Sequence, residues 1–161
     1  MNSERPSGDG RQGATDSARS PGEERARSVL GIVVAHGEMA QGLADAVRKI
    51  AGMDETVLVP VSNEGCSPDT LCGKLEGAAG EGPAIIFTDL QSGSCALAAR
   101  IMCRNFNHVV VSGVNLPMLL DFVFNRELPL DELVERVVGK GRESIQNFPL
   151  PVRHVDPPVS R

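Results

Sequence analysis

Hydrophobic runs alternate with segments of helical periodicity along the middle of this chain. Continuous apolar runs occupy residues 29–35, 56–61, 84–88 and 108–112, a pattern typical of strands buried on both faces of a parallel sheet. A segment with helical spacing of apolar residues follows each run, and two such segments follow the last run. These segments are residues 39–50, Pro68 to the turn at 80–83, 94–102, 117–125 and 130–147. The order predicts an α/β fold: an open, mostly parallel four-stranded sheet with helices on both faces.

The helices carry start signals and predicted buried faces. Ser67 is the expected N-cap of the second helix, with Pro68 at its first position and Asp69 near its positive end. Ser94 is the expected cap of the third helix. The residues expected to share a buried face are Met39, Leu43, Ala46, Val47 and Ile50 in the first helix, and Leu97, Ala98, Ile101 and Met102 in the third.

The two ends of the chain differ in composition from the middle. Residues 1–27 contain Gly, Ser, Pro, Arg and acids with almost no large apolar side chain, so we predict a disordered tail. Residues 149–161 form a Pro-rich tail that includes His154, to which we assign no role. We therefore predict one folded domain, at residues 28–148.

Composition and charge narrow the possible functions. The chain has no Trp or Tyr, five Phe and a net charge of −5, which argues against nucleic-acid binding through stacked bases and a basic face. The acidic surface fits either basic partners or none. Without an apolar stretch of membrane-spanning length or a signal-peptide core, we expect a cytoplasmic protein. Its four cysteines, Cys66, Cys72, Cys95 and Cys103, lack zinc-site spacing and are expected to be reduced, mostly buried thiols.

Polar residues follow three of the predicted strands. His36-Gly37, Asp89 and Gly113-Val114-Asn115 stand where these strands end. In an open parallel sheet the carboxyl ends of the strands lie on one rim, and ligands bind there at the point where the strand order reverses. The sequence thus predicts a site on this rim.

His36 is the main candidate for chemistry. A histidine before a helix can hold an anion, such as a phosphoryl group, beside backbone N–H groups. Asp89 can accept a hydrogen bond from one ring nitrogen and leave the other free as a nucleophile. The alternative is a structural histidine bonded to a nearby carboxylate. His108 has no obvious partner and is expected to be a surface or structural residue.

Four segments resemble the mannose family of sugar phosphotransferase-system (PTS) enzyme IIA proteins. They are VVAHGEMAQGL at 33–43, FTDLQSGS at 87–94, SGVNLPMLL at 112–120 and GRESIQN near 141–147. The resemblance spans about residues 29–148. It implies a phosphotransferase with a phosphohistidine intermediate, which takes its phosphoryl group from the phosphocarrier protein HPr and passes it to a IIB component. The IIB component then phosphorylates sugar bound by membrane components (IIC and IID).

The resemblance also implies roles for individual residues. It places the phosphorylated histidine at His36, the orienting carboxylate at Asp89 and the phosphate-binding positions at Gly37, Gly93 and Ser94. The segment Asn115-Leu116-Pro117 is expected to face a partner. No cofactor and no metal are expected. The family implies a homodimer in which a fifth, antiparallel strand is exchanged, here residues after about Gly139, and a separate IIB is expected because no IIB segment follows in this chain.

One segment departs from the family pattern. Where the family usually has Gly-Gly-Ser-Pro after the aspartate, this chain has Ser92-Gly93-Ser94-Cys95. This bears on the efficiency of transfer or the identity of the IIB partner. Cys95 lies at a predicted helix start, which lowers a thiol's pKa. It is therefore either a redox-sensitive thiol or a small packing residue.

Two other functions stay open. The protein is alternatively a regulatory phosphoprotein that reports phosphoenolpyruvate status without transporting sugar. It is otherwise a metal or nucleotide binder that uses His36, Asp89 and Cys95 as ligands, although neither a G-x-G-x-x-G motif nor a P-loop occurs in the sequence.

Overall fold

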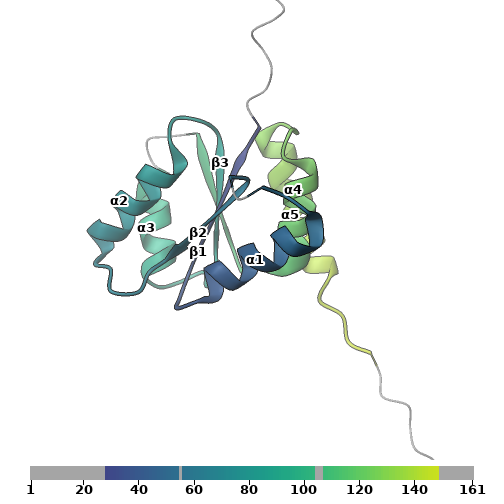
Figure 1. Cartoon of the computed structure of the whole chain (residues 1–161), viewed down its shortest axis with the longest axis horizontal. Helices are drawn as coiled ribbons and strands as arrows, with labels where there is room; N and C mark the ends of the chain where they lie inside the picture. The colour runs from purple at the N-terminus through teal and green to yellow at the C-terminus, as the bar shows by residue number, and fades with distance from the viewer. Residues whose placement is uncertain (1–27, 55, 104–106, 149–161) are drawn as a thin grey trace, which may run out of the picture.

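Four parallel strands form the centre of the molecule (Figure 1). The computed structural model describes residues 28–54, 56–103 and 107–148, and both predicted tails lie outside these ranges. The strands are β1 (Leu30–Ala35), β2 (Leu58–Ser62), β3 (Ala84–Thr88) and β4 (His108–Ser112), in the spatial order β2-β1-β3-β4. The predicted open parallel sheet is confirmed.

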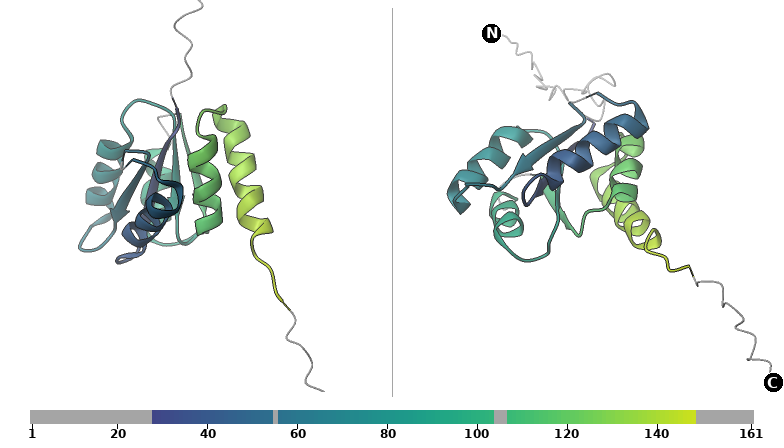
Figure 2. Two further views of the ribbon diagram at one scale, coloured as in Figure 1. Left: turned by 45° about the vertical axis from the view of Figure 1, so that its right-hand side comes forward. Right: turned by 60° about the horizontal axis from the view of Figure 1, so that its bottom comes forward.

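Five helices connect and cover the strands within the described residues. They are α1 (Met39–Ala51), α2 (Pro68–Ala79), α3 (Ser94–Met102), α4 (Leu116–Asn125) and α5 (Leu130–Glu143). Helices α2 and α3 cover one face of the sheet, and α1, α4 and α5 cover the other, as the views in Figures 1 and 2 agree. None of these helices has the length and hydrophobicity to span a membrane.

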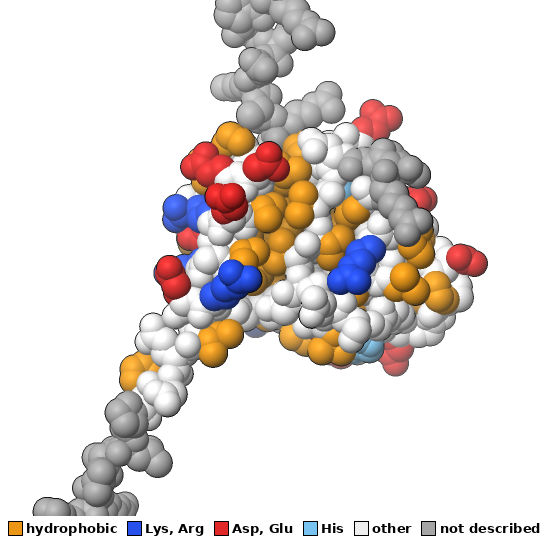
Figure 3. All heavy atoms as spheres, turned by 180° about the vertical axis from the view of Figure 1, so that it is seen from behind, with side chains coloured by type: hydrophobic (Ala, Val, Ile, Leu, Met, Phe, Trp, Pro, Cys, Tyr) orange, Lys and Arg blue, Asp and Glu red, His pale blue; other side chains and the backbone are white. Residues whose placement is uncertain are grey.

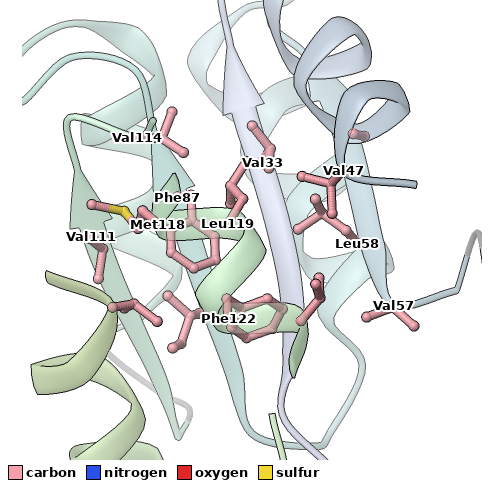
Figure 4. Close-up of a cluster of buried hydrophobic side chains, with 14 of the residues drawn as sticks. Val33, Val47, Val57, Leu58, Phe87, Val111, Val114, Met118, Leu119 and Phe122 are labelled. Atoms are coloured by element: carbon pink, nitrogen blue, oxygen red, sulfur yellow. The ribbon is translucent and has the colours of Figure 1, made fainter. Parts of the chain in front are cut away.

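Alternate residues of the strands supply two separate hydrophobic cores. Ile32 and Val34 face α2 and α3, whereas Val33 and Ala35 face the other three helices. The second of these cores is drawn in Figure 4, where Phe87 of β3 meets Phe122 of α4 edge to face, with ring centroids 5.3 Å apart. A side chain of this size fits beneath the sheet because β1 has Gly31 at that point. A Cβ atom on Gly31 would lie 2.5 Å from Cε1 of Phe122.

Several predicted boundaries and faces are corrected. Pairing with β1 begins at Leu58, so β2 covers 58–62 and not 56–61. Helix α5 ends at Glu143 and not at 147, and Ser144, its C-cap, donates from its hydroxyl to the carbonyl of Gly141. In α1 and α3 small side chains pack against the sheet, so residues predicted to be buried are exposed: Met39, Ile50, Leu97 and Ile101.

Candidate functional site

The carboxyl ends of β1 and β3 meet at the point where the strand order reverses. The chain leaves β1 for β2 on one side and later enters β3 on the other side of β1. His36 directly follows β1 and Asp89 directly follows β3. The predicted convergence of these two residues on one rim is therefore found in the structure.

His36 and Asp89 are joined by two hydrogen bonds to the same carboxylate oxygen. Nδ1 of His36 lies 2.7 Å from Oδ2 of Asp89, and the backbone N–H of His36 donates to that oxygen at 3.0 Å. The other oxygen, Oδ1, accepts from the N–H of Leu90 at 2.8 Å. The carboxylate thus ties the end of β1 to the loop after β3 and fixes the imidazole ring.

The protonation of this pair follows from the environment of Asp89. Burial by itself raises the pKa of Asp89, but the hydrogen bonds from His36 and Leu90 outweigh burial and hold this pKa below its usual value. Because an ionised carboxylate only accepts hydrogen bonds, the shared proton lies on Nδ1 of His36. In the neutral form of the ring, Nε2 then carries the lone pair, on a side chain that is 50% exposed.

The two predicted phosphate-binding glycines have positive φ angles. Gly37 has φ +53° and Gly93 has φ +113°, conformations that residues with a Cβ adopt at a cost. A Cβ atom would meet nothing within 4 Å at either position. Backbone conformation, and not lack of space, therefore explains glycine here.

Ser94 lies in a different position from the one predicted. Gly93 is the N-cap of α3, and Ser94 is its first helical residue. Its hydroxyl oxygen accepts a hydrogen bond from the Asn63 side-chain amide at 3.2 Å. Cys95 is consequently the second residue of α3, where a backbone N–H has no partner within the helix.

Asn63 and Ser62 are site residues that the sequence reasoning missed. Asn63 follows β2, and its backbone N–H donates to the carbonyl of Ala35, immediately before His36. The hydroxyl of Ser62 donates to the carbonyl of Gly37 at 3.1 Å. The sequence did contain evidence for these residues. They follow the predicted strand at 56–61, which was the one strand whose polar C-terminal residues were not considered as site candidates.

The Asn115-Leu116-Pro117 segment is half-buried at the start of α4. Oδ1 of Asn115 caps α4 by accepting from the N–H of Met118, and its Nδ2 donates to the carbonyl of Gly141 in α5. Both polar groups of Asn115 thus have internal hydrogen-bond partners. A contact of this segment with a partner stays a prediction.

The four cysteines are free thiols, of which Cys95 is buried and the others are half-buried. Burial, and then the negative charge of Asp89, raise the pKa of the Cys95 thiol. The prediction of a lowered pKa is wrong, because the side chain points into the core formed by α2 and α3.

His108 is a buried structural histidine whose Nε2 lies 3.1 Å from the carbonyl oxygen of Gly82.

The family model described as "PTS system fructose IIA component" matches residues 31–138, more than half of the chain. The chain belongs to this family of PTS IIA components. The match contains the whole rim described above, from His36 to Asn115. As a member of the family the protein is a phosphotransferase-system component in general terms, and the predicted family is confirmed.

Solved structures of similar proteins agree in fold. The phosphotransferase system component EIIA from Streptococcus agalactiae is 27% identical, with a TM-score of 0.69 over 74% of this chain and 97% of that chain. The mannose/sorbose-specific IIA subunit from Enterococcus faecalis is 22% identical, with a TM-score of 0.68 over 77% of this chain and 97% of its own. No curated protein sequence matches the chain.

Proposed function

We propose that this protein is a phosphocarrier, which accepts a phosphoryl group from phospho-HPr on Nε2 of His36 and passes it to a separate IIB component. The observation that supports this is the geometry of one histidine. Nδ1 of His36 is held by Asp89 at 2.7 Å, while Nε2 belongs to a half-exposed ring at the carboxyl end of the central strand β1. Membership in a family of PTS components supports the same reaction class.

The proposed transfer needs no group beyond those at the rim. The lone pair on Nε2 attacks phosphorus, and the bond from phosphorus to the donor breaks, with its electron pair leaving on the donor. The ring then carries a phosphoryl group on Nε2 and a proton on Nδ1, so it is positively charged. Asp89 faces this charge and stabilises it. The same positive charge makes the ring a good leaving group when the phosphoryl group moves to IIB.

The start of α3 is the proposed binding site for the phosphoryl oxygens. Backbone N–H groups and the positive end of a helix favour an anion. Because Asn63 donates to the hydroxyl oxygen of Ser94, that hydroxyl keeps its own proton for a phosphoryl oxygen. Gly37 and Gly93 let the two loops approach the same anion without side chains between them.

The proposal assigns partners to two surfaces. Met39, Leu90 and Leu97 follow or lie beside the site residues and are 43%, 55% and 53% exposed, so we place the docking of HPr and IIB on this apolar margin of the rim. The IIC and IID membrane components are then reached through IIB. The carrier itself is placed in the cytoplasm.

The protein is also proposed to form a homodimer through the edge of its sheet. Among the described residues, strand β4 has a neighbour on one side only, and an unpaired edge invites pairing. Beside this edge runs a groove lined by Val110, Val111, Val134 and Val138, with Arg100 and Arg142 at its sides. Figure 3 shows such an apolar strip between basic side chains. Residues 139–143, expected in an exchanged strand, are helical here, which leaves the residues after them for that role.

Phosphate uptake tests the proposal directly. Wild type, His36→Ala and the control His108→Gln are incubated with labelled phosphoenolpyruvate, enzyme I and HPr, and acid-labile phosphate is counted. His108 begins β4 and so lies at the opposite end of the strands from His36. Wild type and His108→Gln should take up label, and His36→Ala should take up none. Equal labelling of His36→Ala, or no labelling of wild type, would contradict the proposal.

Adding IIB proteins then separates transport from signalling. Loss of label from the phosphorylated protein to a IIB component supports the carrier role. Retention of label in the presence of every IIB component of the same cell would instead favour the regulatory phosphoprotein.

A further inference from the structure

Three metal-ligating groups of different chemical kinds meet at the rim. They are the imidazole of His36 after β1, the carboxylate of Asp89 after β3 and the thiol of Cys95 in α3. One ligand atom from each lies within 4.8 Å of the other two. Within residues 28–54, 56–103 and 107–148, no other three His, Cys, Asp or Glu side chains come together in this way. The thiol is the member that replaces the proline usual in the family pattern.

The distances suit a single small ion after slight movement. Zinc binds sulfur, nitrogen and oxygen at about 2.0–2.3 Å, which places two ligands of one tetrahedral ion roughly 3–4 Å apart. The Nδ1 and Oδ2 atoms of His36 and Asp89 are already 2.7 Å apart. The adjustment of about 1 Å toward Cys95 falls on the His36 ring, which is half exposed and turns at the cost of its hydrogen bond to Asp89.

The donor set selects the kind of metal. Imidazole nitrogen and thiolate sulfur are ligands of zinc and similar transition metals, whereas magnesium and calcium take oxygen ligands. With one thiolate, one carboxylate and a neutral imidazole, a divalent ion forms a centre of zero net charge. Such a centre is not opposed by the positive end of α3.

We propose that Zn²⁺ binds to His36, Asp89 and Cys95 and excludes the phosphoryl group from His36. A neutral imidazole has one lone pair, so a ring nitrogen that binds zinc leaves no lone pair for phosphorus. Zinc binding releases the thiol proton to solvent, and as Nδ1 of His36 and Oδ2 of Asp89 become ligands the Nδ1 proton moves to Nε2, which then has no lone pair. By linkage, a ring phosphorylated on Nε2 binds zinc more weakly in return. The ion is an inhibitor in this scheme and not a cofactor.

Direct binding of Co²⁺ tests the site without relying on phosphoryl transfer. Cobalt takes similar ligands, and a cobalt–thiolate bond gives a charge-transfer absorption band. Full-length wild type should bind one Co²⁺ per chain with this band, and excess Zn²⁺ should abolish it. Cys95→Ala should lose the band, and its affinity should fall by more than the roughly 10- to 100-fold that loss of an outer-sphere partner costs. Cys66→Ala, which removes a half-buried thiol on another loop, should keep it.

A second variant and a second readout protect the test from folding artefacts. Cys95→Ser keeps the size of the side chain and should also lose the band, with an unchanged circular dichroism spectrum. Zn²⁺ should reduce phosphate uptake by wild type and Cys66→Ala, each compared with its own uptake without zinc, and should affect Cys95→Ala much less. Absence of the band in wild type, or its persistence in both Cys95 variants, would overturn the inference. The binding result stands or fails separately from the proposed phosphocarrier function.

Discussion

Replacing Asp89 by Asn tests the link between site geometry and phosphoryl transfer. The substitution keeps the shape of the side chain but removes its charge. Oδ2 of Asp89 now accepts from both the ring Nδ1 and the backbone N–H of His36, while Oδ1 accepts from Leu90. An Asn side chain has one acceptor oxygen, so its amide group must face N–H donors on one of the two sides. Either His36 or Leu90 therefore loses an acceptor.

The expected loss of rate follows from the charge that develops on the ring. A hydrogen bond to a charged group contributes roughly 1.5–3 kcal/mol, and each 1.36 kcal/mol of barrier changes a rate tenfold. Loss of the stabilised imidazolium should thus slow uptake by about 10- to 150-fold. If the Asn amide donates to Nδ1, the proton moves to Nε2 and the nucleophile is lost, and a wrong tautomer costs about 10⁴ in a catalytic triad. We expect at least a 10-fold loss.

The assay is a rapid-quench time course of phosphate uptake from saturating phospho-HPr. Asp45→Asn is the matched control, because Asp45 is an exposed partner of Arg48 on α1 and lies outside the site. Urea unfolding of both variants, followed by circular dichroism, establishes the folded fraction. A rate for folded Asp89→Asn within about threefold of wild type, less than 1 kcal/mol of barrier, would refute the orienting role of Asp89.

Two glycines give further predictions, both measured by urea unfolding with Gly77→Ala in α2 as the control, where a Cβ meets nothing within 4 Å. Gly93→Ala should lower the free energy of unfolding by about 1–3 kcal/mol, because φ is +113° there, and should also slow phosphate uptake. Gly31→Ala should lower it by about 1–3 kcal/mol through overpacking against Phe122 and Leu58, without a direct effect on the site. Loss of stability in Gly77→Ala equal to that of either variant would contradict these explanations.

The strands were the most predictable part of the fold. The run at 84–88 and the run at 108–112 match β3 and β4 residue for residue, because each is a short apolar segment bounded by turn residues. Helix faces were less predictable. Hydrophobicity favours Leu97 and Ile101 as buried residues of α3, yet both are exposed. The predicted Ala98 and Met102 are buried, together with the unpredicted Ala96 and Ala99. Close packing of a helix on a sheet selects small side chains. Counting apolar positions cannot detect that the buried face of the helix is rotated by one residue.

The same reasoning explains which parts of the site were predictable. His36 and Asp89 end buried strands, and the rule that ligands bind at the carboxyl ends of parallel strands brings them together before any coordinates are known. The environment of Cys95 depends instead on the direction of one side chain at a helix start. Helix position alone predicts a low pKa, but burial beside Asp89 raises it. The thiol that replaces a proline is therefore held protonated next to His36. We expect this thiol to react by binding a metal ion rather than by being oxidised.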